Sequence, residues 1–174
     1  GLAHGADRLE EPLLLREREL LRQMQLTTPG WLTWITKDDQ YSKQKLTGDL
    51  ESLRSFYLNR GYLESNIEST QVSITPDREK IYITVALNEG PVYRLGDIKF
   101  SGDLIVPERE LRELVAMAPG ETFSRQRVIE SVKRITDRLS NDGYSFANVN
   151  PVPDIDREKR VASFTFFVDP GRRV

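Results

Sequence analysis

The sequence predicts an α+β fold made of two tandem β-α-α-β-β modules, each a three-stranded mixed sheet covered on one face by two helices. Two repeated segments carry this prediction: residues 56–62 recur 82 positions later as 138–144, and residues 77–80 recur as 156–159. An apolar stripe with the same spacing precedes each helix end; its members are Leu46, Leu50, Leu53 and Tyr57 in one copy and Val128, Val132, Ile135 and Leu139 in the other. Repeated modules of this kind usually bind other molecules.

The amino-acid composition limits the kinds of protein that this chain can be. The chain has 174 residues, 38% of them hydrophobic and 30% charged, which is typical of a soluble globular protein. Residues 1–12 are interpreted as a cloning remnant or an atypical start, residues 13–90 as the first module and residues 91–174 as the second. The net charge of −2 argues against nucleic-acid binding. The lack of cysteine excludes disulfides and leaves the compartment open.

Targeting signals are equally sparse. No signal peptide is visible, so the sequence leaves open a cytosolic chain or a part of a longer secreted one. No apolar run approaches the ~20 residues of a membrane-spanning helix, and we therefore expect no membrane span in this chain.

The first module is expected to begin with helices. Apolar periodicity predicts one helix over residues 13–25, ended by the proline and glycine that follow. Residues 31–35 are interpreted as a connection, because they are too few for an independent helix. A second helix is predicted over 42–59, with Ser42 as its N-cap and Gly61 as its left-handed C-cap.

A β-hairpin is expected to complete the first module. Residues 66–75 show partial alternation of apolar and polar side chains, and residues 81–87 alternate cleanly. Polar residues 76–80 lie between them and are typical of a turn.

The first strand of the first module is expected to be missing. Residues 16–20 parallel the helix start at 107–111, so this strand should fall within residues 2–11, which are poor strand formers. A two-stranded sheet is marginal and leaves backbone groups unpaired. We expect another chain, or the unusual N-terminal residues, to fill that edge.

The second module follows the complete order. Its predicted elements are a strand at 93–101, helices at 107–117 and 124–141, and strands at 148–154 and 160–168. Ser124 is the expected cap of the longer helix, and the break in alternation at Gly96-Asp97 predicts a bulge. Pro151 and Pro153 cannot donate to a ladder, so their strand should lie at a sheet edge.

This order of elements, with Gly-Tyr after the second helix, resembles the POTRA (polypeptide-transport-associated) domain family. The resemblance is closest to the tandem POTRA domains of outer-membrane protein assembly factors of the BamA type, in particular the third and fourth of their five. Matching stretches cover 41–50, 53–62, 69–77, 85–90 and 146–172. It implies a periplasmic part of an outer-membrane protein in a Gram-negative bacterium.

The strand at 66–75 is the strongest candidate for a binding site. If it lies at an edge, its free N–H and C=O groups can pair with an incoming extended chain, which is β-augmentation. The candidate residues are Asn66, Ile67, Glu68, Gln71, Val72, Ser73 and Ile74. The same open edge could also support self-association.

The resemblance implies two kinds of protein partner. These are unfolded outer-membrane protein precursors, which would pair with the strand edge, and accessory assembly lipoproteins of the β-propeller type. The residues that match the docking region for the lipoprotein are Leu26, Gln71, Val72 and Ile74. Trp31 and Trp34 are either a hydrophobic anchor for a partner or a plug under the helices.

Enzymatic functions find little support. The chain has one histidine, His4 in the N-terminal tail, and no phosphate-binding glycine loop, so we expect no catalytic residues, metal or cofactor. Asp38 and Asp39 are more simply explained as solvated carboxylates. Two alternatives to the assembly-factor interpretation remain: a POTRA pair of a related secretion or translocation transporter, and a structural spacer.

Overall fold

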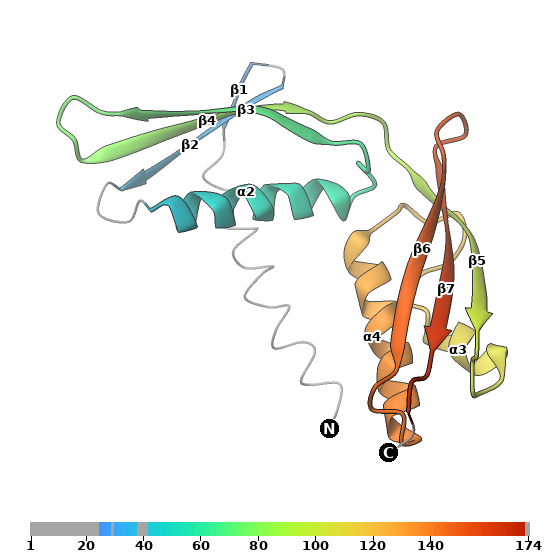
Figure 1. Ribbon diagram of the computed structural model, residues 1–174. Helices are drawn as coiled ribbons and strands as arrows, with labels where there is room; N and C mark the ends of the chain where they lie inside the picture. Colours follow the sequence, from blue (N-terminus) through green and yellow to red (C-terminus); the bar gives the residue numbers. More distant parts are fainter. Residues whose placement is uncertain (1–24, 29, 38–41, 173–174) are drawn as a thin grey trace. The chain divides into compact units, whose positions relative to one another are not determined.

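The computed structural model describes residues 25–28, 30–37 and 42–172, which form two compact units. Residues up to 57 together with 64–90 make the first unit, and residues 58–63 join those from 91 onward in the second. Each unit is one sheet with helix packed on one face, which confirms the predicted α+β class (Figure 1). The first sheet, however, has four antiparallel strands in place of the three-stranded mixed sheet that the sequence predicts. None of the described helices is long and apolar enough to span a membrane.

The first unit contains a four-stranded antiparallel sheet in the order β1-β2-β4-β3. Its elements are β1 (Gln25–Thr28), β2 (Trp31–Lys37), α2 (Lys43–Leu58), β3 (Asn66–Ile74) and β4 (Lys80–Asn88). The predicted hairpin is therefore confirmed. The backbone N–H of Lys45 donates to the Ser42 hydroxyl at 3.0 Å, which confirms Ser42 as the cap of α2.

Residues 31–37 are a strand, and the prediction that they only connect two helices was wrong. Trp34 and Thr36 are buried while Ile35 and Lys37 are exposed, which is the alternation of a half-buried strand. β2 pairs with β4 along its whole length, so this chain itself fills the edge that we expected another chain or residues 2–11 to fill. Unpaired backbone groups in a sheet are costly, and β2 satisfies them.

Only the end of the predicted first helix lies within the described residues. Gln25, which we placed in the helix at 13–25, is the first residue of β1. The rest of that helix, and the predicted start at 1–12, lie outside the described residues.

The core of the first unit forms between β2, β4 and α2. Trp34 pairs across the ladder with Ile83, and both side chains are fully buried with Ile81 and Val85. Leu53 and Tyr57, members of the predicted apolar stripe, are buried on α2. The predicted stripe therefore faces the sheet, as a core-facing helix requires.

The second unit has the three-stranded mixed sheet that the sequence predicts, in the order β5-β7-β6. Its elements are β5 (Arg94–Gly102), α3 (Glu108–Leu114), α4 (Arg125–Asn141), β6 (Asn148–Asp156) and β7 (Val161–Asp169). β5 runs parallel to β7 and β6 runs antiparallel to it, so the proline-bearing strand is at an edge as expected. The predicted bulge is also confirmed, because the β5–β7 register shifts between Leu95 and Ile98.

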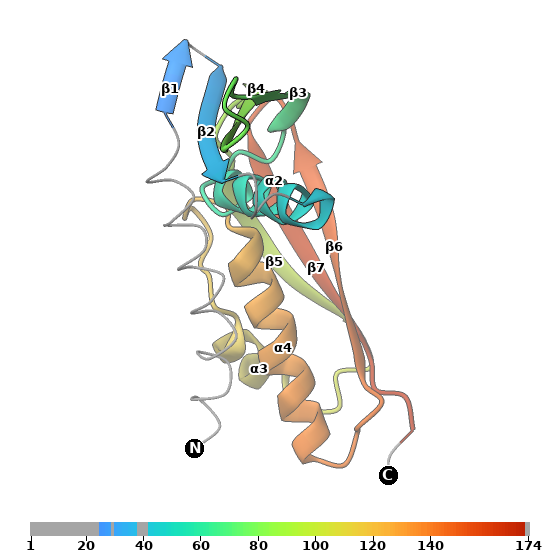
Figure 2. The ribbon, with the colours of Figure 1, turned by 90° about the vertical axis from the view of Figure 1, so that its left-hand side faces the viewer.

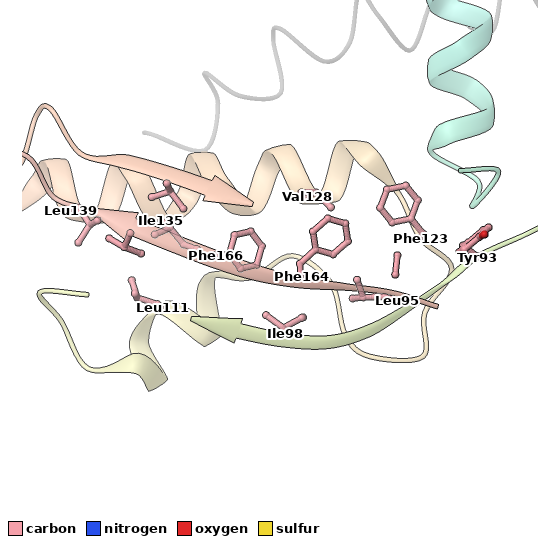
Figure 3. Packing of buried hydrophobic residues seen from close by; sticks show 13 residues of the cluster. Tyr93, Leu95, Ile98, Leu111, Phe123, Val128, Ile135, Leu139, Phe164 and Phe166 are labelled. Carbon is pink, nitrogen blue, oxygen red and sulfur yellow. The ribbon is translucent and has the colours of Figure 1, made fainter. Parts of the chain in front are cut away.

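A continuous apolar core joins the sheet of the second unit to α3 and α4 (Figure 3). Two pairs of aromatic rings stack within it, Phe123 on Phe164 and Phe100 on Phe166, with centroids 5.8 Å and 5.7 Å apart. Ser131 of α4 is a buried polar residue. Its hydroxyl donates to the Arg127 carbonyl and accepts from the Ala116 N–H. The buried hydroxyl of Ser131 is therefore fully hydrogen-bonded, and it ties the connection after α3 to α4.

Gly61, the predicted C-cap of α2, is held in a left-handed conformation inside the second unit. Its φ is +90°, and its carbonyl accepts a 2.7 Å hydrogen bond from the N–H of Tyr93. A Cβ at this position would lie 2.8 Å from Val92 Cγ1 and 2.9 Å from the Tyr93 carbonyl oxygen. Only glycine fits both the backbone conformation and the available space.

We expect Gly61→Ala to lower the free energy of unfolding by about 2–4 kcal/mol, the sum of left-handed strain and overpacking. Gly120 is the matched control, since its φ is +91° and a Cβ added there would meet no atom within 4 Å. Gly120→Ala should therefore cost only the backbone strain, about 1–2 kcal/mol. Chemical denaturation of both variants checks this, and equal losses would contradict the packing argument.

Candidate strand-edge binding site

β3 forms an open edge of the first sheet. Among the described residues it pairs only with β4, so one row of its backbone N–H and C=O groups is unpaired within the sheet (Figure 1). The strand is nine residues long, contains no proline, and every residue except Ile67 is exposed. Such an edge has the geometry that accepts an additional strand.

The two faces of β3 differ in polarity. Val72 lies opposite Ile83 and Ile74 opposite Ile81, so both project on the face that carries the core, yet their side chains are 41% and 61% exposed. Gln71 and Ser73 project on the other face. An added strand would find apolar neighbours on one face and polar neighbours on the other, which favours chains with alternating side chains.

A β-bulge divides the predicted site. The β3–β4 register shifts between Ile67 and Ser69, which leaves Glu68 as the extra residue. A bulge bends the strand and interrupts its ladder, so Asn66 and Ile67 are set apart from the regular edge that begins at Ser69. The regular part contains Gln71, Val72, Ser73 and Ile74, and the sequence pattern had given no sign of the bulge.

The structure does not bring Leu26 to this edge. Leu26 belongs to β1, and β2 and β4 lie between β1 and β3 (Figure 2). A partner that touched Leu26 and Ile74 together would have to span the width of the sheet. The docking residues implied by the family resemblance therefore lie on opposite edges.

The two tryptophans have different environments. Trp34 is only 1% exposed and is the largest fully buried side chain of the first unit, so it serves as part of the core. Its indole Nε1–H is buried without a hydrogen-bond acceptor. Trp31 is half-buried opposite Ala86 and remains within reach of solvent.

The corresponding edge of the second unit is chemically different. β6 is also paired on one side only within the described residues, but it carries Pro151 and Pro153. Proline has no N–H, so β6 presents a broken row of donors. Of the two edges, β3 is the better acceptor for an extended chain.

The repeated Asp-Arg-Glu-Lys segment closes both hairpins. The Asp156 carboxylate accepts from the N–H groups of Glu158 and Lys159 at 3.1 Å and 3.0 Å. In the first unit the Thr75 hydroxyl donates to the Asp77 carboxylate, which also accepts from the Glu79 N–H. These bonds, led by the one from Thr75, lower the pKa of Asp77 below its ordinary value. The segment is a hairpin turn, as interpreted from the sequence.

In the part of the chain that the structure describes, no group of three or more His, Cys, Asp and Glu side chains is placed to hold a metal ion. An open polar depression of about 400 Å³ lies beside the N-terminus of α4, lined in part by Gln126, Arg127 and Glu130. It is shallow and its polar groups pair with their neighbours, as Arg127 does with Glu121 at 3.8 Å.

These features define a tandem pair of α+β modules, the first of which has an exposed strand edge. The family model described as POTRA, surface antigen variable number repeat, matches residues 12–90 and 93–171. The chain therefore belongs to the POTRA family, and the resemblance noted from its sequence is confirmed.

Within this family, the chain is similar to curated outer membrane protein assembly factors and to one of their solved structures. The outer membrane protein assembly factor BamA of Neisseria meningitidis serogroup B is 33% identical over 159 residues, which cover 91% of this chain and 20% of that protein. BamA of Buchnera aphidicola is 30% identical over 144 residues, covering 83% and 23%. The crystal structure of Haemophilus influenzae BamA POTRA3-5 matches with a TM-score of 0.68 and 32% identity over 90% of this chain and 61% of that one. The chain spans about a fifth of the length of these curated relatives.

The turn beside the edge strand gives a testable electrostatic prediction. Because the pKa of Asp77 is lowered, the charged carboxylate stabilises the hairpin fully at a pH above the ordinary pKa of 3.8. This contribution is lost as the pH falls through the lowered pKa. Thr75→Val removes the main hydrogen bond and should raise the pKa of Asp77 toward 3.8. An NMR titration of the carboxyl carbon measures this. Thr70→Val, a change within β3, is the control and should leave the pKa of Asp77 unchanged. An unchanged pKa in Thr75→Val would refute the assignment.

Proposed function

We propose that this chain is a periplasmic, protein-binding part of an outer-membrane β-barrel assembly factor, and that β3 binds extended client chains by β-augmentation. The observation that carries the proposal is the open, proline-free edge of β3. Membership of the POTRA family and the likeness to BamA proteins support the setting. The proposed action is binding rather than catalysis.

The mechanism follows from backbone chemistry. An incoming strand donates and accepts main-chain hydrogen bonds along residues 69–74, and these bonds are available to any extended sequence. Exposed Val72 and Ile74 add contact with alternate apolar side chains, the pattern of a β-barrel strand. Each net hydrogen bond contributes only about 0.5–1.5 kcal/mol, so binding is weak and reversible. Weak, sequence-tolerant binding suits a factor that must release its clients.

Accessory docking would use the same edge. Of the residues matched to a β-propeller lipoprotein partner, Gln71, Val72 and Ile74 lie on the regular part of β3, whereas Leu26 lies on β1. A lipoprotein that covered these three residues would leave no free edge at the same place for a client. We therefore propose that the two partners compete for β3.

Adjacent proline substitutions test the client site. In an antiparallel pair, the N–H groups of successive residues point alternately toward the partner strand and away from it. Of Gln71→Pro and Val72→Pro, one therefore removes a donor from the open edge and the other breaks the β3–β4 ladder. We expect the variant that keeps its circular dichroism spectrum to bind a β-barrel strand peptide about threefold to tenfold more weakly.

Amide NMR titration gives the readout, with a proline-substituted peptide as the control. Shifts confined to residues 66–74, and lost with the control peptide, are the expected result. Unchanged binding by the well-folded proline variant would count against client binding at β3. No shifts at about millimolar peptide would favour a spacer or a purely accessory-docking role.

A further inference from the structure

The sheet of the second unit has two edge strands, β6 and β5. Pro151 and Pro153 interrupt the backbone donors of β6. β5 is nine residues long and contains no proline, so its own sequence leaves the row of donors complete. Any protection of the β5 edge against an added strand must therefore come from other parts of the unit.

The first half of the β5 edge is covered by residues 120–122 of the same unit. The N–H of Leu95 donates to the Glu121 carbonyl at 2.7 Å, and the carbonyl of Leu95 accepts from the Gly120 N–H at 2.8 Å. This segment therefore occupies both outward-pointing backbone groups of Leu95. An incoming chain finds no free hydrogen-bonding group at this residue.

The second half of the β5 edge follows the bulge, and the side chain of Arg112 in α3 reaches it. Arg112 Nη1 donates to the Ile98 carbonyl at 3.1 Å, so this carbonyl points away from β7. The register with β7 is regular from Ile98 to Gly102, and the backbone groups of Phe100 therefore point the same way. No strand pairs with this side of β5 among the described residues.

The position of Arg112 is fixed by its neighbours. Its guanidinium carbon lies 5.3 Å from the centroid of the Phe100 ring, within the range of a cation–π contact. Its Nη2 lies 3.7 Å from the carboxylate of Glu108, one turn earlier on α3. The preceding residue, Leu111, is fully buried in the core and holds α3 on the sheet (Figure 3). The guanidinium is thus kept at the outer side of β5.

A guanidinium in this place disfavours strand addition for two reasons. It occupies the Ile98 carbonyl, which an incoming N–H group would need. An added strand would also cover the side chain of Arg112, which is half-exposed, and burial of a charge without a matching partner is costly. Charged side chains are one means by which proteins keep sheet edges free. Residues 69–74 of β3, in contrast, include no charged side chain.

We propose that Arg112 is a specificity-determining residue for strand binding: it closes the β5 edge to extended client chains, so that these chains pair with β3. The inference rests on the proposed function in that the excluded ligand is the same extended chain, but it concerns a different sheet. Arg112 acts by exclusion and makes no contact with a client bound at β3. Removal of its guanidinium opens a second acceptor site at residues 98–102.

Neutral substitutions of Arg112 test this role. Arg112→Met removes the charge and the donors but keeps an unbranched side chain that can cover Phe100. Arg112→Leu is a second neutral variant with a good helix former, so a folding defect in one variant does not decide the result. Arg112→Lys keeps a charged donor and should keep the edge closed. Arg109→Met is the matched control, because Arg109 is an exposed arginine of the same helix.

The readout is the amide NMR titration with the β-barrel strand peptide. We expect shifts at residues 98–102 in the two neutral variants, with affinity at that edge at least about tenfold higher than in the unsubstituted protein, Arg112→Lys and Arg109→Met. Shifts at 98–102 in the unsubstituted protein, or none there in a folded neutral variant at about millimolar peptide, would overturn the inference. Shifts at residues 66–74 report on β3 separately, so failure of the proposed function is seen independently of Arg112.

Discussion

Pairing of β4 on both of its sides is the constraint on which the first unit depends. Ile81, Ile83 and Val85 of this strand are fully buried, so β4 is the centre of the core as well as of the sheet. A strand so placed cannot leave its backbone groups unpaired. β2 therefore takes one side and β3 the other, and β3 carries the proposed binding site on its open edge.

The two modules share one architecture and differ at their edges. From Ser69 to Ile74, β3 presents a regular row of backbone donors, whereas Pro151 and Pro153 interrupt the row on β6. Sheet edges invite unwanted association, and proline is one of the ways in which proteins prevent it. The retention of an open edge in one module and its protection in the other supports a division of labour between them.

An open edge has a structural cost, which bears on how it functions. Val72 and Ile74 remain exposed on a strand that has a partner on one side only. Local contacts at such a strand are few, so its ends open more readily than the core. The Asp77 turn closes the hairpin next to Ile74 and limits that opening. The edge is thereby held in an extended form.

Features that depend on residues close together in the chain can be predicted from the sequence. The repeat, the hairpins, the Ser42 cap, the left-handed Gly61 and the edge position of the strand with Pro151 could all be predicted from periodicity, capping and proline chemistry. The folded chain was needed to show that β2 is a strand, that Glu68 is bulged and that Leu26 lies far from β3. Strand order and register depend on hydrogen bonds between distant residues, and no local pattern encodes which strand completes an unpaired ladder.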